Sequence, residues 1–133
     1  MVGTGYVGLV SGLCFAEFGY ETICVDKDQD RLNYITKGKC PFYEPGLDDL
    51  LYKHINSTKL VKFSSNLSKE LSQADIIFIT VGTPSRRLVD EADLSAIFEV
   101  TEVIANNISK YSVIVTKSTV PVGTTRKIKE IIS

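Results

Sequence analysis

The chain has 133 residues with 44% hydrophobic side chains, which fits one globular domain rather than two and argues against disorder. Its formal net charge is −1, and acids and bases are mixed along the chain without a basic stripe, so we expect no nucleic-acid partner. No apolar run is long enough to span a membrane, and we expect no leader peptide before the glycine-rich segment that starts at Gly3.

The first expected helix runs from Tyr6 to Phe18 and follows a glycine-rich turn. Its apolar residues recur at helical spacing, which predicts a buried stripe of Val7, Val10, Cys14 and Phe18. Gly19 should close the helix in the left-handed conformation that glycine adopts without strain.

Short apolar strands then alternate with amphipathic helices, which is typical of an α/β fold. The strands are expected at 22–26, 60–63, 76–81 and 113–116, the third with both faces covered. The helices are expected at 28–37, 47–55, 66–74 and 93–108, with a last one starting at 124. Asp28 and Asp93 are predicted helix caps, and Gly38 a helix stop. The order predicts a Rossmann-type, doubly wound parallel sheet.

The first strand of that fold is expected to be truncated, because only Met1 and Val2 precede Gly3. This strand normally lies in the middle of the sheet, in the order 3-2-1-4-5-6, and a mean strand has about 5–6 residues. Without it, the strands at 22–26 and 76–81 would leave backbone donors and acceptors facing a gap.

Gly3, Gly5 and Gly8 fit the GxGxxG pattern, and Asp26 ends the next expected strand at the distance typical of dinucleotide-binding folds. Gly3 permits a tight turn, Gly5 lets a pyrophosphate approach the backbone, and Gly8 lets helix and strand pack closely. Asp26 can accept hydrogen bonds from ribose hydroxyls and repel a 2′-phosphate, which favours NAD over NADP. The neighbouring cations Lys27 and Arg31 are the opposing signal, because a cation could accommodate that phosphate. A purely structural turn and a capping carboxylate are the alternatives.

The cysteines and the single histidine indicate neither a disulfide framework nor a metal site. Cys14, Cys24 and Cys40 are odd in number and form no CxxC pair, which is typical of buried thiols in a reducing compartment such as the cytoplasm. His54 has no neighbouring ligand cluster, so we expect it on the surface of a helix and predict no bound metal.

Five segments in order resemble the NAD-binding domain of the UDP-glucose/GDP-mannose dehydrogenase family, and together they span nearly the whole chain. They are GTGYVGLV at 3–10, YEPGL at 43–47, VGTP at 81–84, ADLS at 92–95 and KSTVPVGT at 117–124. The resemblance implies that the backbone of Tyr6 and Val7 lies against the dinucleotide. It also implies that Asp26 binds the ribose with Arg31 beside it.

The resemblance further implies that Thr83 packs against the cofactor and that Thr119 lies near the reacting carbon, where it holds a water or the substrate oxygen. Helix capping is the alternative for both threonines. Both segments follow expected parallel strands, whose carboxyl ends are where ligands bind in open α/β sheets. Glu44 in the EPGL segment is given no role.

The resemblance implies one domain over residues 1–133 of a larger enzyme, which oxidises a nucleotide sugar with two NAD. The motif wording favours UDP-glucose, with GDP-mannose, UDP-N-acetylmannosamine and a non-catalytic remnant domain as alternatives. We expect the dimer-forming helix and the sugar-binding half with its nucleophilic cysteine to be absent, and the isolated chain to be inactive. Family members form homodimers or higher oligomers. The segment Ser85–Glu91, with Arg86, Arg87 and Leu88, departs from the family pattern.

Overall fold

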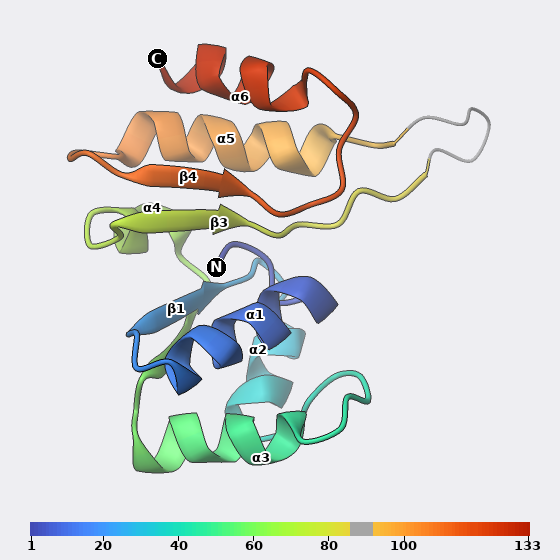
Figure 1. Ribbon diagram of the computed structural model, residues 1–133, viewed down its shortest axis with the longest axis vertical. Helices are drawn as coiled ribbons and strands as arrows, with labels where there is room; N and C mark the ends of the chain where they lie inside the picture. Colours follow the sequence, from blue (N-terminus) through green and yellow to red (C-terminus); the bar gives the residue numbers. More distant parts are fainter. Residues whose placement is uncertain (86–91) are drawn as a thin grey trace.

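The computed structural model describes residues 1–85 and 92–133 (Figure 1). The residues that depart from the family pattern, Arg86, Arg87 and Leu88, therefore lie outside the described part of the chain. The strands are β1 (Thr22–Val25), β2 (Val61–Ser64), β3 (Ile76–Ile79) and β4 (Val113–Thr116). The helices are α1 (Tyr6–Glu17), α2 (Gln29–Thr36), α3 (Leu47–Tyr52), the π-helical turn η1 (Lys53–Ser57), α4 (Leu67–Leu71), α5 (Ser95–Asn107) and α6 (Thr124–Ile132). None of the described helices is long and apolar enough to cross a membrane.

A three-residue segment at the amino terminus joins two parallel strand pairs into one sheet. β1 pairs with β2, and β3 pairs with β4. Val2 forms parallel bridges to both Val25 and Ile79 and donates a 2.8 Å hydrogen bond to the Phe78 carbonyl. The resulting order, β2-β1-Val2-β3-β4, is the 3-2-1-4-5 order of a Rossmann sheet. Within this chain Val2 holds the central strand position, between β1 and β3.

Two hydrophobic clusters cover the two faces of this sheet, as the doubly wound prediction requires. The first is formed by Leu9, Leu13, Ala16, Cys24, Ile35, Leu47, Leu51 and Val61, from α1, β1, α2, α3 and β2. The second is formed by Val2, Leu71, Ile77, Ile79, Ile97, Ile104 and Ile128. Met1 packs against the first cluster while Val2 belongs to the second, because successive strand residues point to opposite faces. In Figure 1 the amino terminus lies between β1 and β3.

The predicted buried stripe of α1 is wrong, although the bounds of the helix agree closely with the prediction. Phe18 is 75% exposed and Val7 41% exposed. The buried face carries Gly8, Leu9, Gly12, Leu13 and Ala16 instead. The helix is apolar on every side, so periodicity did not distinguish its faces. Small residues occupy the sheet-facing positions because they let α1 approach β1: a methyl group on Gly12 would lie 2.7 Å from Cys24 Sγ.

The predicted helix ends are confirmed at three of four positions. Gly19 and Gly38 have φ of 93° and 77°, and Asp28 caps α2 by accepting a hydrogen bond from the Arg31 amide. Asp93 lies one residue too early to be the cap of α5, because Leu94 occupies that position. Its carboxylate still stabilises the helix start by accepting a 3.0 Å hydrogen bond from the Ser95 amide.

His54 is buried, with 1% of its surface exposed, so the expectation of a surface residue is wrong. Its two ring nitrogens lie 2.9 Å from Glu17 Oε2 and 2.8 Å from Thr58 Oγ1. Lys53 Nζ also donates to the Glu17 carboxylate at 2.8 Å. Burial is tolerated because both polar ring atoms have partners. The histidine thus links η1 to the last turn of α1.

Candidate functional site

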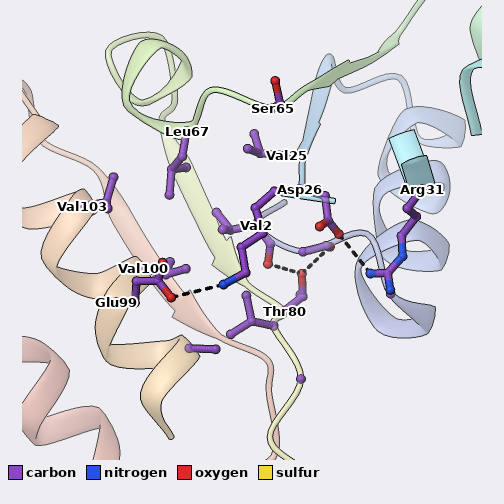
Figure 2. Close-up of a pocket in the computed structure, with 16 residues that line it drawn as sticks. Val2, Val25, Asp26, Arg31, Ser65, Leu67, Thr80, Glu99, Val100 and Val103 are labelled. Carbon is purple, nitrogen blue, oxygen red and sulfur yellow. Dashed lines mark hydrogen bonds and ion pairs between the residues drawn. The ribbon is translucent and has the colours of Figure 1, made fainter. Parts of the chain in front are cut away.

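A cavity of about 510 Å³ opens at the ends of β1 and β3, the two strands that flank the amino-terminal segment. Its lining comes from the glycine turn, the end of β1, the segment after β3 and one side of α5. In Figure 2, Asp26 and Arg31 lie on one side of it and Glu99, Val100 and Val103 on the other. The cavity therefore occupies the carboxyl edge of a parallel sheet, at the point where its strand order reverses.

The three motif glycines have different surroundings, and only Gly3 and Gly5 line the cavity. Gly3 has φ of 102°, and a methyl group there would lie 2.9 Å from the Thr80 carbonyl oxygen. Gly8 leaves no room for a side chain, because a methyl group there would lie 1.8 Å from the Gly3 carbonyl oxygen. Gly5 lines the cavity, and a methyl group there would have no atom within 4 Å. Gly3 and Gly8 thus shape the turn, whereas Gly5 leaves space beside the first turn of α1.

The Asp26 carboxylate is bonded directly to the glycine turn. Its Oδ2 accepts hydrogen bonds of 2.7 Å from both the amide and the hydroxyl of Thr4, and one of 3.2 Å from Arg31. Its Oδ1 accepts a 3.0 Å hydrogen bond from the Asp28 amide. The side chain is only 9% exposed. These bonds hold the acid at the end of β1 and beside the residue that separates Gly3 from Gly5.

These hydrogen bonds also keep Asp26 ionised. Burial alone would raise the pKa of its carboxyl group, but the bonds from Asp28 and Thr4 outweigh burial, with a further contribution from the Arg31 charge. The pKa therefore lies below its ordinary value. At neutral pH the cavity presents a fixed negative charge, which accepts hydrogen bonds and repels a phosphate.

The two cations beside Asp26 are both paired with acids. Arg31 contacts Asp26 at 3.2 Å and Asp28 at 3.8 Å, so two carboxylates hold its guanidinium. Lys27 contacts Glu99 of α5 at 3.3 Å, but both side chains are mostly exposed and such a pair contributes little. Arg31 thus balances the charge of Asp26 rather than offering a free anion site.

Thr83 and Thr119, which were predicted from two distant motifs, lie together at the ends of β3 and β4. The Thr83 hydroxyl donates a 3.0 Å hydrogen bond to the Thr119 carbonyl. Ser118 reinforces the junction by donating a 2.7 Å hydrogen bond to the Val81 carbonyl. Gly82, next to Thr83, lines the cavity. Neither threonine lines the cavity itself, so the structure places them at its outer edge.

Tyr6 and Val7 lie on the first turn of α1 and are exposed, outside the cavity lining. The Tyr6 hydroxyl donates a short hydrogen bond to Glu44 of the EPGL segment. This bond raises the pKa of the phenol. The Tyr6 ring also lies 4.9 Å from that of Phe42, measured between centroids. The loop before α3 is thereby attached to the start of α1, a contact that the sequence did not predict.

Two threonines of the site were missed in the reading of the sequence. Thr4 lies between the first two motif glycines and is fully buried, with its hydroxyl on Asp26. Thr80 lines the cavity, and its hydroxyl lies 2.8 Å and 3.0 Å from the carbonyls of Val2 and Gly3, to which it donates. Their position inside or directly beside the motifs was the available signal, since a tight polar turn needs donors for its carbonyl groups.

The glycine turn, the helix start and the acid together fit an adenine dinucleotide. The amides in the first turn of a helix have no partner within the helix and attract anions, and here they adjoin the open Gly5 position. A carboxylate at the end of the second strand of the fold suits ribose hydroxyls. Fold and site therefore define a dinucleotide-binding domain of the Rossmann class.

The comparisons with known proteins identify the family. The model of the UDP-glucose/GDP-mannose dehydrogenase family, NAD binding domain, matches residues 1–133, and the chain belongs to this family as an NAD-binding domain. It is 48% identical over 132 residues to a UDP-glucose 6-dehydrogenase of Rhizobium meliloti (strain 1021), covering 99% of this chain and 30% of that protein. It is 42% identical to the UDP-glucose 6-dehydrogenase TuaD of Bacillus subtilis (strain 168), covering 99% of this chain and 28% of that protein.

Solved structures agree with this assignment. A ternary complex of a GDP-mannose dehydrogenase from Pseudomonas aeruginosa superposes with a TM-score of 0.92 at 34% identity, over 98% of this chain and 30% of that one. A UDP-glucose dehydrogenase from Pyrobaculum islandicum gives 0.88 at 28% identity, over 98% and 32%. The chain thus spans between 28% and 32% of the length of each of these four proteins.

Proposed function

We propose that this chain is the cofactor-positioning domain of a UDP-glucose 6-dehydrogenase, which oxidises UDP-glucose to UDP-glucuronate with two NAD. The observation that carries the proposal is the double hydrogen bond from Thr4 to Asp26, which fixes the acid beside the glycine turn in one cavity. Two relatives, at 48% and 42% identity, are UDP-glucose 6-dehydrogenases, and this supports UDP-glucose as the substrate. A cytoplasmic location and assembly into homo-oligomers stay predictions.

Each site residue has a positioning task in this proposal. The turn at Gly3, Gly5 and Gly8 and the backbone of Tyr6 and Val7 receive the pyrophosphate at the start of α1. Asp26 accepts hydrogen bonds from the adenosine ribose, with Arg31 neutralising part of its charge. NAD supplies hydride acceptance, while the protein supplies binding and orientation.

Thr83 and Thr119 complete the site at the reactive end of the cofactor. The hydrogen bond from Thr83 fixes the Thr119 backbone, which leaves the exposed Thr119 hydroxyl free to orient a water or the sugar oxygen. We include Thr119 as the one residue of this chain that touches reacting atoms. Its position after β4 supports this role, because ligands bind at the carboxyl ends of parallel strands.

We further propose that the isolated chain does not turn over UDP-glucose, because the sugar-binding half and its nucleophilic cysteine belong to the remainder of a longer enzyme. Two of the three thiols of this chain support the point. Burial raises the pKa of Cys24 to about 11, and burial together with Asp48 raises that of Cys40 to about 12. Neither thiol is suited to attack a sugar carbon at neutral pH.

Calorimetric titration with NAD tests cofactor binding. The unmodified chain should bind NAD, and Asp26→Asn should weaken binding at least about tenfold, the usual effect of losing one charge-assisted hydrogen bond. Glu130→Gln is the control, since Glu130 is exposed on α6 away from the cavity, and it should leave the affinity unchanged. Equal affinities for the Asp26 variant and the unmodified chain would contradict the proposal.

An NADH-production assay tests the second part. The purified chain with NAD and UDP-glucose should give no turnover above the rate without protein. Adding the separately expressed sugar-binding half of a relative tests whether the domain can still supply the cofactor site. Substantial turnover by the chain alone would refute the assignment of the remaining chemistry to other parts of the enzyme.

A sibling substrate is the second candidate, favoured by the TM-score of 0.92 to a GDP-mannose dehydrogenase. The cavity described above would serve either enzyme, since it would hold the cofactor and not the sugar. Assaying a full-length protein that contains this chain with UDP-glucose, GDP-mannose and UDP-N-acetylmannosamine separates these candidates. A full-length protein that binds no NAD would instead indicate the non-catalytic remnant domain.

A further inference from the structure

The cavity assigned to NAD carries charges of both signs. Among the residues that the structure describes, its charged lining consists of Asp26, Lys27, Arg31 and Glu99. In the function proposed above, Asp26 accepts hydrogen bonds from the adenosine ribose and Arg31 offsets part of its charge. Lys27 and Glu99 have no task in that function, although both line the cavity. Their charges therefore need a separate explanation.

Lys27 lies close to the place where NADP differs from NAD. It follows Asp26 directly, just after β1, and its side chain is 82% exposed. NADP carries a phosphate on the 2′-oxygen of the adenosine ribose, the sugar that Asp26 is placed to bind, and Rossmann-type domains accommodate this phosphate with a nearby cation. A lysine at this point with no acidic partner would therefore favour NADP and oppose the preference that Asp26 creates.

Glu99 occupies this lysine from the opposite side of the cavity. Its Oε2 lies 3.3 Å from the Lys27 ammonium, a contact that Figure 2 marks with the dashed line from Glu99. The two residues are 72 positions apart in the sequence. Glu99 lies one helical turn before Val103 of α5, so it shares the face of the helix that lines the cavity. Side chains from the end of β1 and from α5 thus meet across the cavity.

Arg31, the second cation of the cavity, is paired in the same way. Its guanidinium lies 3.2 Å from the Asp26 carboxylate and 3.8 Å from that of Asp28. With Glu99 at Lys27, each cation beside the ribose position has an acidic partner, and three carboxylates surround two cations. A 2′-phosphate would have to displace an acid in order to reach either cation. The arrangement suits an uncharged 2′-hydroxyl better than a phosphate.

The exposed ion pair between Lys27 and Glu99 has a limited but measurable effect. Both side chains are mostly in water, where such a pair typically changes an equilibrium by up to about fivefold. This is too little to determine whether the domain folds. It is enough to change the ratio between two ligands that differ by one phosphate, because the ligand without the phosphate does not compete for Lys27.

We propose that Glu99 is a specificity-determining residue of the cofactor cavity, which increases the preference for NAD over NADP by pairing with Lys27. The inference rests on the proposed function, because it requires the adenosine ribose to lie at Asp26. Asp26 acts on the ribose directly, whereas Glu99 acts through the lysine and from α5. The glycine motif and its acid therefore do not determine cofactor choice alone, because the opposing cation Lys27 is held by a distant helix.

Titrations of the full chain with NAD, and with NADP as a competitor, test this role at about 0.1 M salt, where charges more than about 10 Å away are largely screened. Glu99→Gln should raise the ratio of NADP affinity to NAD affinity about fivefold, because the Lys27 ammonium then lacks its carboxylate partner. Glu102→Gln is the matched control. It removes the same charge from an exposed position of α5 outside the cavity lining, and it should leave the ratio unchanged.

Repeating the comparison in a Lys27→Gln background shows whether Glu99 acts through the lysine. In that background Glu99→Gln should change the ratio less than about twofold, since there is no cation to release. An unchanged ratio in the first comparison, or equal changes in both backgrounds, would overturn the inference. Either result with a chain that binds NAD would leave the proposed function intact, whereas a chain that binds neither dinucleotide would overturn both.

Discussion

At the scale of single residues, Asp26 is the centre of the cofactor site because four donor groups converge on its carboxylate. Its pKa is lowered in the folded chain, so its contribution to stability is complete above the ordinary value of 3.8 and is lost as pH falls through the lower folded value. Asp26→Asn should reduce the free energy of unfolding by about 2 kcal/mol between pH 5 and 7. Urea denaturation across pH should show this difference shrinking below pH 3.8. A difference that grows on acidification would contradict this role of Asp26, and Asp49→Asn, on the surface of α3, is the control.

The motif glycines separate a structural role from a binding role. Gly8→Ala should destabilise the domain by about 3 kcal/mol or more, because the new methyl group overlaps the Gly3 carbonyl. Gly5→Ala meets no atom within 4 Å and should change stability by less than about 1 kcal/mol, yet it should abolish NAD binding. Thermal denaturation and calorimetry of both variants check this. A Gly5→Ala variant with unaltered affinity would show that the dinucleotide does not approach the turn there.

The thiols of Cys24, which is buried, and Cys40, which is partly buried, give a third prediction at this scale. Cys24 and Cys40, with pKa values raised to about 11 and about 12, should resist iodoacetamide in the folded chain at pH 8. Both should react in denaturant, which provides the control for chemical competence. Mass spectrometry of the alkylated peptides gives the result. Rapid modification of Cys24 under native conditions would show that β1 is more accessible than the structure describes.

At the scale of elements, the sequence predicted most strands and helices to within two residues but not how they pack. Strand 113–116 and the start of the last helix at Thr124 agree with the structure residue for residue. In these segments the apolar residues follow a single spacing, and glycine or polar residues mark where the segments begin and end. The α1 stripe failed because that helix is apolar all round, and its packing depends on Gly8 and Gly12, which carry no hydropathy signal.

The cofactor site was predictable in part for the same physical reason. The glycine turn and Asp26 follow from local backbone requirements and sequence spacing, so they could be found from the sequence. The attachment of Glu44 to Tyr6 joins residues 38 positions apart, and no local pattern reports such a contact. The burial of His54 likewise depends on Glu17 from another helix.

The link between η1 and α1 predicts a stability effect far from the cofactor cavity. His54→Ala removes a buried ring and leaves Thr58 and Glu17 without one partner each, so it should cost about 3 kcal/mol. Asn56→Ala, an exposed change in the same turn, should cost less than about 0.5 kcal/mol. Chemical denaturation of both variants compares them. Equal midpoints would show that the histidine does not hold the two helices together.

At the scale of the whole molecule, one residue joins two halves. Val2 is the only described residue outside the named strands that bridges both β1 and β3, and the cofactor cavity lies at the carboxyl side of its short segment. This side of the segment offers a glycine turn and a fixed acid. The central claim is that NAD occupies this cavity.

Mapping of amide chemical shifts during NAD addition tests that claim most directly. We expect large, saturable changes at Gly3, Gly5, Asp26 and Gly82, with amides near Ile23 and Tyr111 unchanged. Shifts confined to residues far from the glycine turn, or the absence of shifts at the glycine turn with saturating NAD, would contradict it.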